Sequence, residues 1–389
     1  MRPSKAELNF VYGKKTLMPE TVYFDHNATS PLRPAAIEAV EAALRVVGNG
    51  SSVHSCGRAA RKIIEQAREH VATLCGAAPE MITFTSGGTE TNNLILQHTG
   101  RERVLISAVE HPSVKEASSV AEAIPVTTDG VIDVAVLDEM LASDLRPALI
   151  SVMYANNETG IVQPVAEIAE LARKHGAIFH CDAVQAAGKV ALDVRSFGAD
   201  LLTLSAHKIG GPAGSGALIN VSGIEIEPFT RGGGQEKKQR SGTENLIGIA
   251  GFGGAAKETL ELGLENMRNA RRLRDHLEAE ISTHMPNITV VGANVERLGN
   301  TSYFVMPGMD SDTMVMGFDL AGVALSAGSA CSSGTVKASG VLLAMGYEAD
   351  AAGSAIRVSL GWSSKDSDVD AFLAALGPLY ERAGHHQAA

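Results

Sequence analysis

Short apolar runs alternate with amphipathic segments along the first part of the chain. The segments at 59–75 and 164–176 carry apolar residues at the spacing of an α-helix, and Pro164 and Gly176 suit the two ends of the second. The apolar runs have the length of buried strands: "ITFT" (82–85), "RVLISAV" (103–109), "ALISVMYA" (148–155), "AIFHCDA" (177–183), "LLTLSA" (201–206) and "GALIN" (216–220). This alternation predicts an α/β fold with a mostly parallel sheet covered by helices on both faces.

A further helix is expected near the start, over residues 35–47. Ile37, Leu44 and Val47 recur there on one side, opposite Glu38 and Glu41.

The pattern changes after about residue 244. A long helical stretch follows, with the glycines at 251–254 as a predicted interruption, and then shorter strands and a closing helix from about Asp366. These strands are "ITVVG" (288–292), "TSYFVM" (301–306) and "AIRVSLG" (355–361). We therefore expect a large domain at 21–262 and a smaller α+β domain at 263–389, with residues 1–20 packed near the smaller domain or disordered.

Composition narrows the class of protein. The 389 residues are 45% hydrophobic and carry a formal net charge of −11, which disfavours nucleic acid or an anionic membrane as a partner. The N-terminus lacks the apolar core of a signal peptide, and no run reaches the ~18 apolar residues of a membrane span. The four cysteines lie far apart, so free thiols in the cytoplasm are expected.

The stretch "TSGGTETNN" (85–93) joins an apolar strand to a helical run. A glycine-rich turn at a helix start offers free N–H groups and a positive dipole end, which suits a phosphate held by Gly87, Gly88 and Thr89. The alternative is an ordinary helix start after a glycine turn.

The stretch "HCDAVQAAGK" (180–189) places Asp182 where a strand leaves the core. Its carboxylate needs a cation or hydrogen-bond donors there, although it could instead cap a following helix. A metal site with His180, Cys181 and His207 is a further alternative. Adjacent strand residues point to opposite faces, so His180 and Cys181 do not readily share one ion, and no metal is expected.

The stretch "LLTLSAHKIGGPAG" (201–214) places Lys208 after an apolar strand and before a glycine–proline turn. A lysine held in a poorly solvated site has a lowered pKa and can form a Schiff base. Ser205 and His207 flank it, and the alternative is a solvated loop lysine.

Together, a phosphate cradle, a carboxylate and a strand-end lysine are the three anchors that pyridoxal 5'-phosphate needs. Their order resembles the aspartate-aminotransferase-like, fold type I enzymes. His111 in "EHPSV" (110–114) follows another strand, where its ring could stack on the cofactor.

More specific motifs extend this resemblance over most of the chain. The sequence resembles the class V cysteine desulfurases of the NifS/IscS type, through "YFDHNATSP" (23–31), "GNGSSVHSCGR" (48–58), "YANNETG" (154–160), "RSGTEN" (240–245), "SAGSACSSG" (326–334) and "IRVSLG" (356–361), in addition to the stretches above.

The resemblance implies a role for each matched residue. Lys208 would carry the cofactor and then move the substrate's α-proton. Asp182 would bind the pyridine nitrogen, Gln185 would hydrogen-bond the ring hydroxyl, and His111 would stack on the ring. The phosphate would be held by Gly88, Thr89, Ser205 and His207, with Thr243 contributed by the partner subunit of a homodimer. Asn157 and Arg357 would bind the substrate carboxylate, Arg357 by a bidentate fork. From sequence alone Arg357 could equally form a surface salt bridge.

Cys331 lies among small residues, in a stretch that suits a thiol on a loop. The resemblance implies that its thiolate takes the sulfur of L-cysteine as a persulfide, leaving L-alanine, and passes it to an acceptor such as an iron–sulfur scaffold protein. The alternatives are a selenocysteine lyase, another class V aminotransferase, and a cofactor-independent sulfur carrier.

Overall fold

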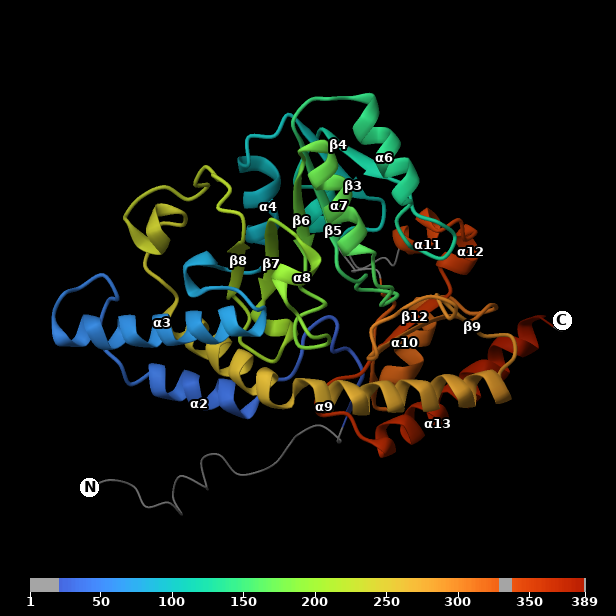
Figure 1. Cartoon of the computed structure of the whole chain (residues 1–389). Coiled ribbons are helices and arrows are strands. Elements are labelled where there is room, and N and C mark those ends of the chain that lie inside the picture. Colours follow the sequence, from blue (N-terminus) through green and yellow to red (C-terminus); the bar gives the residue numbers. More distant parts are fainter. Residues whose placement is uncertain (1–20, 329–337, 388–389) are drawn as a thin grey trace, which may run out of the picture.

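The structure is a computed structural model that describes residues 21–328 and 338–387. A large sheet and its helices lie beside a smaller group of strands and helices from the C-terminal part of the chain (Figure 1). The long helix α9 (Leu246–His284) runs along both groups. It passes residue 262 without a break, and the division of the chain into 21–262 and 263–389 stays a prediction.

The large sheet has seven strands and is mostly parallel, as predicted. The pairs from β7 to β4 are parallel, and β8 runs antiparallel to both of its neighbours. In spatial order the strands are β2 (Ile82–Thr85), β8 (Gly216–Asn220), β7 (Leu201–Ser205), β6 (Ile178–Asp182), β5 (Ala148–Met153), β3 (Arg103–Ser107) and β4 (Ala121–Ile124). The sequence pattern does not predict β4, because its four residues contain two separated alanines and a glutamate.

Helices and short 3-10 turns connect these strands. Helix α7 begins after Pro164 and ends at Gly176, which has a left-handed conformation with φ of 65°, as the sequence suggested. The helical elements up to residue 238 are α2 (Pro34–Ala43), α3 (Ser55–Leu74) and η1 (Pro79–Met81) before β2; α4 (Gly88–His98), α5 (Pro112–Lys115), α6 (Val134–Ser143), α7 (Val165–His175), α8 (Val194–Phe197) and η2 (Ala206–Lys208) between strands; and η3 (Gln235–Lys238) after β8.

Small residues decide how α2, α3 and α9 pack. The glycines at 251–254 do not interrupt α9. Instead they bring it close to its neighbours: a Cβ added to Gly254 would lie 2.4 Å from the carbonyl oxygen of Ala35, and one on Gly253 would lie 2.6 Å from Cα of Ala67. The buried residues of α2 are accordingly Ala36 and Ala43.

The predicted helix at 35–47 is therefore corrected in two respects. It ends at Ala43, so that Leu44 and Val47 follow the helix, and the apolar residues expected on its buried side are exposed. Ile37, Leu44 and Val47 are 42%, 63% and 84% exposed, because helices that approach through alanine and glycine leave no room for larger side chains.

Within the described residues, the C-terminal part contains a three-stranded antiparallel sheet, a two-stranded parallel sheet and, after α9, four helices. The first described residues join this part, since Val22 pairs with Val323 and Asp25 with Ser359. Phe372 packs against other aromatic rings in its core and stacks on Phe318 with ring centroids 5.0 Å apart. The elements are β1 (Val22–Tyr23), β9 (Thr289–Val290), β10 (Thr301–Val305), α10 (Ser311–Leu320), β11 (Val323–Ala324), α11 (Gly340–Ala344), α12 (Ala349–Ala352), β12 (Ala355–Ser359) and α13 (Asp366–Gln387).

Of the helices in the described part of the chain, none combines the length and apolar character that a membrane span requires. The cysteines within the described residues, Cys56, Cys75 and Cys181, are free.

Candidate active site

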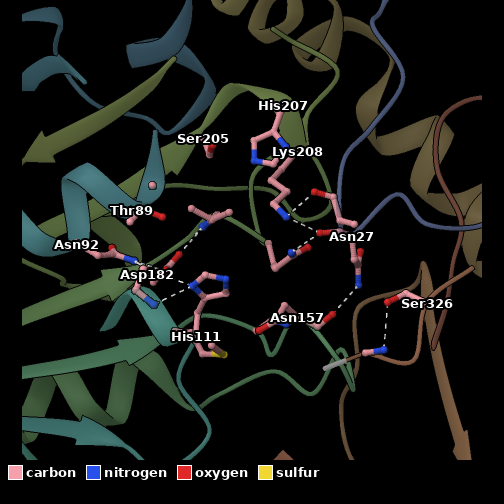
Figure 2. A pocket seen from close by; sticks show the side chains of 18 of the residues that line it. Asn27, Thr89, Asn92, His111, Asn157, Asp182, Ser205, His207, Lys208 and Ser326 are labelled. Carbon is pink, nitrogen blue, oxygen red and sulfur yellow. Dashed lines mark hydrogen bonds between the residues drawn. The ribbon is translucent and has the colours of Figure 1, made fainter. Parts of the chain in front are cut away.

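A pocket of about 360 Å³ lies at the carboxyl ends of β2, β3, β5, β6 and β7, and this volume is that of a small-ligand site. Figure 2 shows the side chains of residues that line it. Parallel strands present their carboxyl ends at one edge of a sheet, so side chains distant in sequence meet there. The structure brings together in this pocket the predicted residues Gly88, Thr89, His111, Asn157, Asp182, Gln185, Ser205, His207, Lys208 and Arg357.

Lys208 lies in η2, directly after β7, and points into the pocket (Figure 2). Its Nζ donates hydrogen bonds to the backbone carbonyl oxygens of Asn27 at 2.6 Å and Ala28 at 2.8 Å. Burial, and secondly the charge of Arg357, lower the pKa of the Lys208 amine to about 8. Lys208 is therefore not a solvated loop lysine, and its amine is a better nucleophile near neutral pH than that of an ordinary lysine.

Asp182 is the last residue of β6 and is buried. One carboxylate oxygen accepts a hydrogen bond from the amide of Asn92 at 2.8 Å, and the other accepts one from the backbone N–H of Val184 at 3.0 Å. Residues 184–189 form turns, so Asp182 does not cap a helix. The carboxylate is thus held at the pocket wall by two donors.

His180 and Cys181 precede Asp182 on the same strand and are fully buried. Both ring nitrogens of His180 are already engaged, Nδ1 with the hydroxyl of Ser151 at 2.8 Å and Nε2 with that of Thr203 at 2.9 Å. These contacts leave no ring nitrogen for a metal, and the described residues contain no metal-binding group of three or more histidine, cysteine or acidic side chains.

His111 is joined to Asp182 through a chain of hydrogen bonds. Its Nδ1 accepts from the backbone N–H of Ser113 at 3.1 Å and lies 2.8 Å from that residue's hydroxyl. The Ser113 hydroxyl in turn accepts from Asn92, which also donates to Asp182. Burial lowers the pKa of His111, and the charge of Asp182 opposes this less strongly. The ring is therefore neutral near pH 7, and the network fixes its position.

Two residues of the predicted phosphate cradle, Gly88 and Thr89, lie at the N-terminus of α4. Gly88 and Thr89 form its first turn, where backbone N–H groups have no partner within the helix. Thr89, Ser205 and His207 lie along one side of the pocket, with Asn157 and Ser326 on the other (Figure 2). Burial, followed by the charge of Lys208, lowers the pKa of His207 to about 4, so this ring offers a hydrogen bond without a positive charge.

Arg357 reaches the pocket from β12, in the C-terminal part of the chain. Its guanidinium donates to the carbonyl oxygen of Asn157 at 2.9 Å and to a carboxylate oxygen of Asp25 at 2.7 Å. The Arg357 side chain is only 4% exposed, so this ion pair is not a surface salt bridge. The contact fixes a cationic group at the side of the pocket formed by the smaller sheet.

Comparison with known proteins identifies the family. The model of the aminotransferase class-V family matches residues 22–372. The chain belongs to this family.

Individual relatives support the predicted resemblance to NifS- and IscS-like members of the class-V family. The sequence is 38% identical over 379 residues to an IscS-like cysteine desulfurase of Mycobacterium tuberculosis, covering 93% of this chain and 96% of that protein. The structure matches a NifS-like protein from Rickettsia africae with a TM-score of 0.87 and 38% identity, covering 93% of this chain and 99% of the other. It also matches the structure of SspA in complex with cysteine with a TM-score of 0.76 and 28% identity, covering 88% of this chain and 99% of the other.

Two predicted site residues are not among the described residues that line the pocket. Cys331 lies outside the described residues, although Ser326 and Gly328, shortly before it in the sequence, line the pocket. Thr243 lines a separate pocket together with Arg240. Its assignment to the phosphate site of a partner subunit stays a prediction.

Sequence reasoning assigned no role to Asn27, which is central to the site. Its backbone carbonyl oxygen accepts hydrogen bonds from Lys208 and from the amide of Gln185, the latter at 2.9 Å. Its side-chain oxygen accepts from Lys189 at 2.6 Å. The motif "YFDHNATSP" contains Asn27, but the contacts join segments that are far apart in sequence. Asn92 was missed for the same reason.

Proposed function

We propose that this protein is a pyridoxal-phosphate-dependent cysteine desulfurase, which converts L-cysteine to L-alanine and transfers the sulfur to Cys331 as a persulfide. The observation that carries the proposal is the position of Lys208. Its amine, with a pKa lowered to about 8, lies in the same pocket as the Asp182 carboxylate and the N-terminus of α4. The similarity to cysteine desulfurases supports the choice of reaction within the class-V family.

The residues of the pocket fit the cofactor. An amine, a buried carboxylate and a helix N-terminus correspond to the aldehyde, the pyridine nitrogen and the phosphate. Lys208, Asp182 and Gly88–Thr89 would hold these three groups, and Gln185 would contact the ring hydroxyl. When bound, pyridoxal phosphate supplies an electron sink for the α-carbon of an attached amino acid.

The chain's own groups would perform the remaining tasks. The Lys208 nitrogen can accept the substrate's α-proton and return it, because its neutral form is well populated near pH 8. The neutral ring of His111 provides a second group that can take up a proton. Arg357 would bind the substrate carboxylate, with Asp25 and Asn157 holding its guanidinium in place.

Sulfur transfer is assigned to the Cys331 thiolate. An S–S bond forms to Cys331, the substrate C–S bond breaks, and the product carbon gains a proton to give alanine. Cys331 follows the pocket-lining Gly328 by three residues in the sequence, which supports this assignment. We propose an iron–sulfur scaffold protein as the acceptor of the sulfur, and a cytoplasmic location.

We further propose a homodimer. The exposed Ile37, Leu44 and Val47, close together in the sequence, support it, because exposed apolar surface is commonly covered by a partner. The separation of Thr243 from the pocket of its own chain is consistent with its use by a partner subunit.

The decisive experiment is Cys331→Ala, assayed with L-cysteine. We expect alanine formation to fall by a factor of about 100 or more while the visible absorbance of the bound cofactor is retained. Cys56→Ala, at an exposed thiol, is the control and should behave as wild type. Alanine formation at the wild-type rate in Cys331→Ala would contradict the mechanism. Turnover of selenocysteine alone would indicate a lyase, and amino-group transfer to a 2-oxo acid an aminotransferase.

A further inference from the structure

Lys189 lies behind the pocket and was given no role by the proposed function. Its Nζ donates hydrogen bonds to the side-chain oxygens of Gln185 and Asn27, each at 2.6 Å. Both of these partners are buried. The Lys189 nitrogen thus points inward, toward Gln185 and Asn27. These two residues also contact each other, and the Asn27 carbonyl oxygen accepts a further hydrogen bond from Lys208.

The surroundings of Lys189 are unfavourable for a cation. Among the described residues no carboxylate bonds to it, and the charged groups that act on it most are Lys208 and Arg357, both cationic. Loss of hydration, and then these two charges, lower the pKa of Lys189 well below its ordinary value. A lysine in such a place does not stabilise the fold through its charge, so another role must explain it.

The hydrogen bond from Lys189 to Gln185 fixes the orientation of the Gln185 amide. The Gln185 nitrogen donates to the Asn27 carbonyl oxygen, which can only accept, while the Gln185 oxygen faces Lys189. Asn27 depends less on Lys189, since its side-chain oxygen also accepts from the Asn300 amide at 3.0 Å and its amide nitrogen donates to the Thr301 hydroxyl at 2.9 Å. Without Lys189 the Gln185 amide would lose the donor that holds its oxygen away from the pocket.

We propose that Lys189 is a positioning residue of the active site. It holds the side-chain oxygen of Gln185, so that the amide nitrogen of Gln185 is presented as a hydrogen-bond donor on the Lys208 side. The inference rests on the proposed function, because a donor at this point is useful only for a ligand with an acceptor there. The phenolic oxygen of the cofactor ring is such an acceptor. Lys189 itself does not line the pocket, and it acts through Gln185.

A double-mutant cycle with Lys189→Met and Gln185→Leu tests this. The dissociation constant of pyridoxal phosphate is measured for the apoenzyme of each variant, with the absorption maximum of the bound cofactor and the melting temperature. We expect each single variant to bind the cofactor about tenfold more weakly, because each loses the effect of one hydrogen bond to a charged group. The double variant should bind the cofactor no more weakly than either single variant. Both single variants should shift the absorption maximum in the same direction.

Controls separate positioning from a structural role. Lys174→Met, at an exposed lysine paired with Asp138, should match wild type throughout. Lys189→Arg keeps N–H donors and should restore at least part of the cofactor affinity. The melting temperature of Lys189→Met should stay within about 5 °C of wild type, because the lost hydrogen bonds are offset by relief of the poorly hydrated cation. If Lys189→Met does not fold, Lys189→Gln replaces it in the cycle.

The outcomes are distinct. Additive effects of the two substitutions on the dissociation constant, or an unchanged affinity with a lowered melting temperature, would overturn the inference. A wild-type protein that binds no pyridoxal phosphate would instead overturn the proposed function, before any comparison of variants.

Discussion

The lowered pKa of Lys208 predicts how fast the apoenzyme captures its cofactor at different pH values. Only the neutral amine attacks an aldehyde, and the pKa falls from 10.5 to about 8. A difference of about 2.5 pKa units raises the neutral fraction roughly 300-fold at pH values well below 8. The rate constant should therefore rise about tenfold per pH unit up to about pH 8 and then level off.

The assay is stopped-flow mixing of apoenzyme with pyridoxal phosphate between pH 6 and 10, followed by the change in visible absorbance. The reference is the reaction of N-acetyl-lysine with pyridoxal phosphate in solution. In that reaction the cofactor has the same ionisable groups, but the amine has an ordinary pKa. Arg357→Gln removes the second cause of the shift, so the midpoint should move to higher pH while staying below 10.5, because burial is the larger cause. A rate that rises continuously to pH 10, as with the reference amine, would refute the reasoning.

Two further substitutions test the supports of the site. Asn92→Leu removes the 2.8 Å hydrogen bond to Asp182 and should raise the cofactor's dissociation constant about tenfold in a fluorescence titration. Asn287→Leu, at an exposed asparagine, is the control and should leave the dissociation constant unchanged. Equal affinities of the two variants would contradict a supporting role for Asn92. Asp25→Asn removes the charge paired with Arg357, so the KM for L-cysteine should rise several-fold with a smaller change in kcat, and an unaltered KM would count against the carboxylate-binding assignment.

The pocket could be predicted from the sequence because its functional residues lie at the carboxyl ends of strands that the sequence pattern predicts. Lys208, Asp182 and His111 each come directly after an apolar run, and parallel strands bring their carboxyl ends to one edge. The strand positions were themselves predictable, since the runs at 82–85 and 216–220 coincide with β2 and β8. The apolar runs in the sequence, together with the shared edge at which parallel strands end, therefore determined much of the site.

The supports of the pocket could not be predicted in this way. Asn27 contributes through hydrogen bonds with several segments that are distant in sequence, and Lys189 bonds to one of its two partners across such a distance. An asparagine or a lysine carries no periodic signal that would announce these contacts. Arg357 was expected in the site, but its pairing with Asp25 depends on β12 lying against the start of the chain.

The sequence by itself determined most strands of the large sheet and their alternation with helices, the strand-end functional residues and the resemblance to a family, because these depend on neighbouring residues and on motifs. Only the tertiary structure decided which side of α2 is buried, and it chose Ala36 and Ala43 over the larger Ile37 and Leu44. The physical reason is that burial depends on the partner surface: the glycines of α9 allow close approach, and only small side chains fit between the helices.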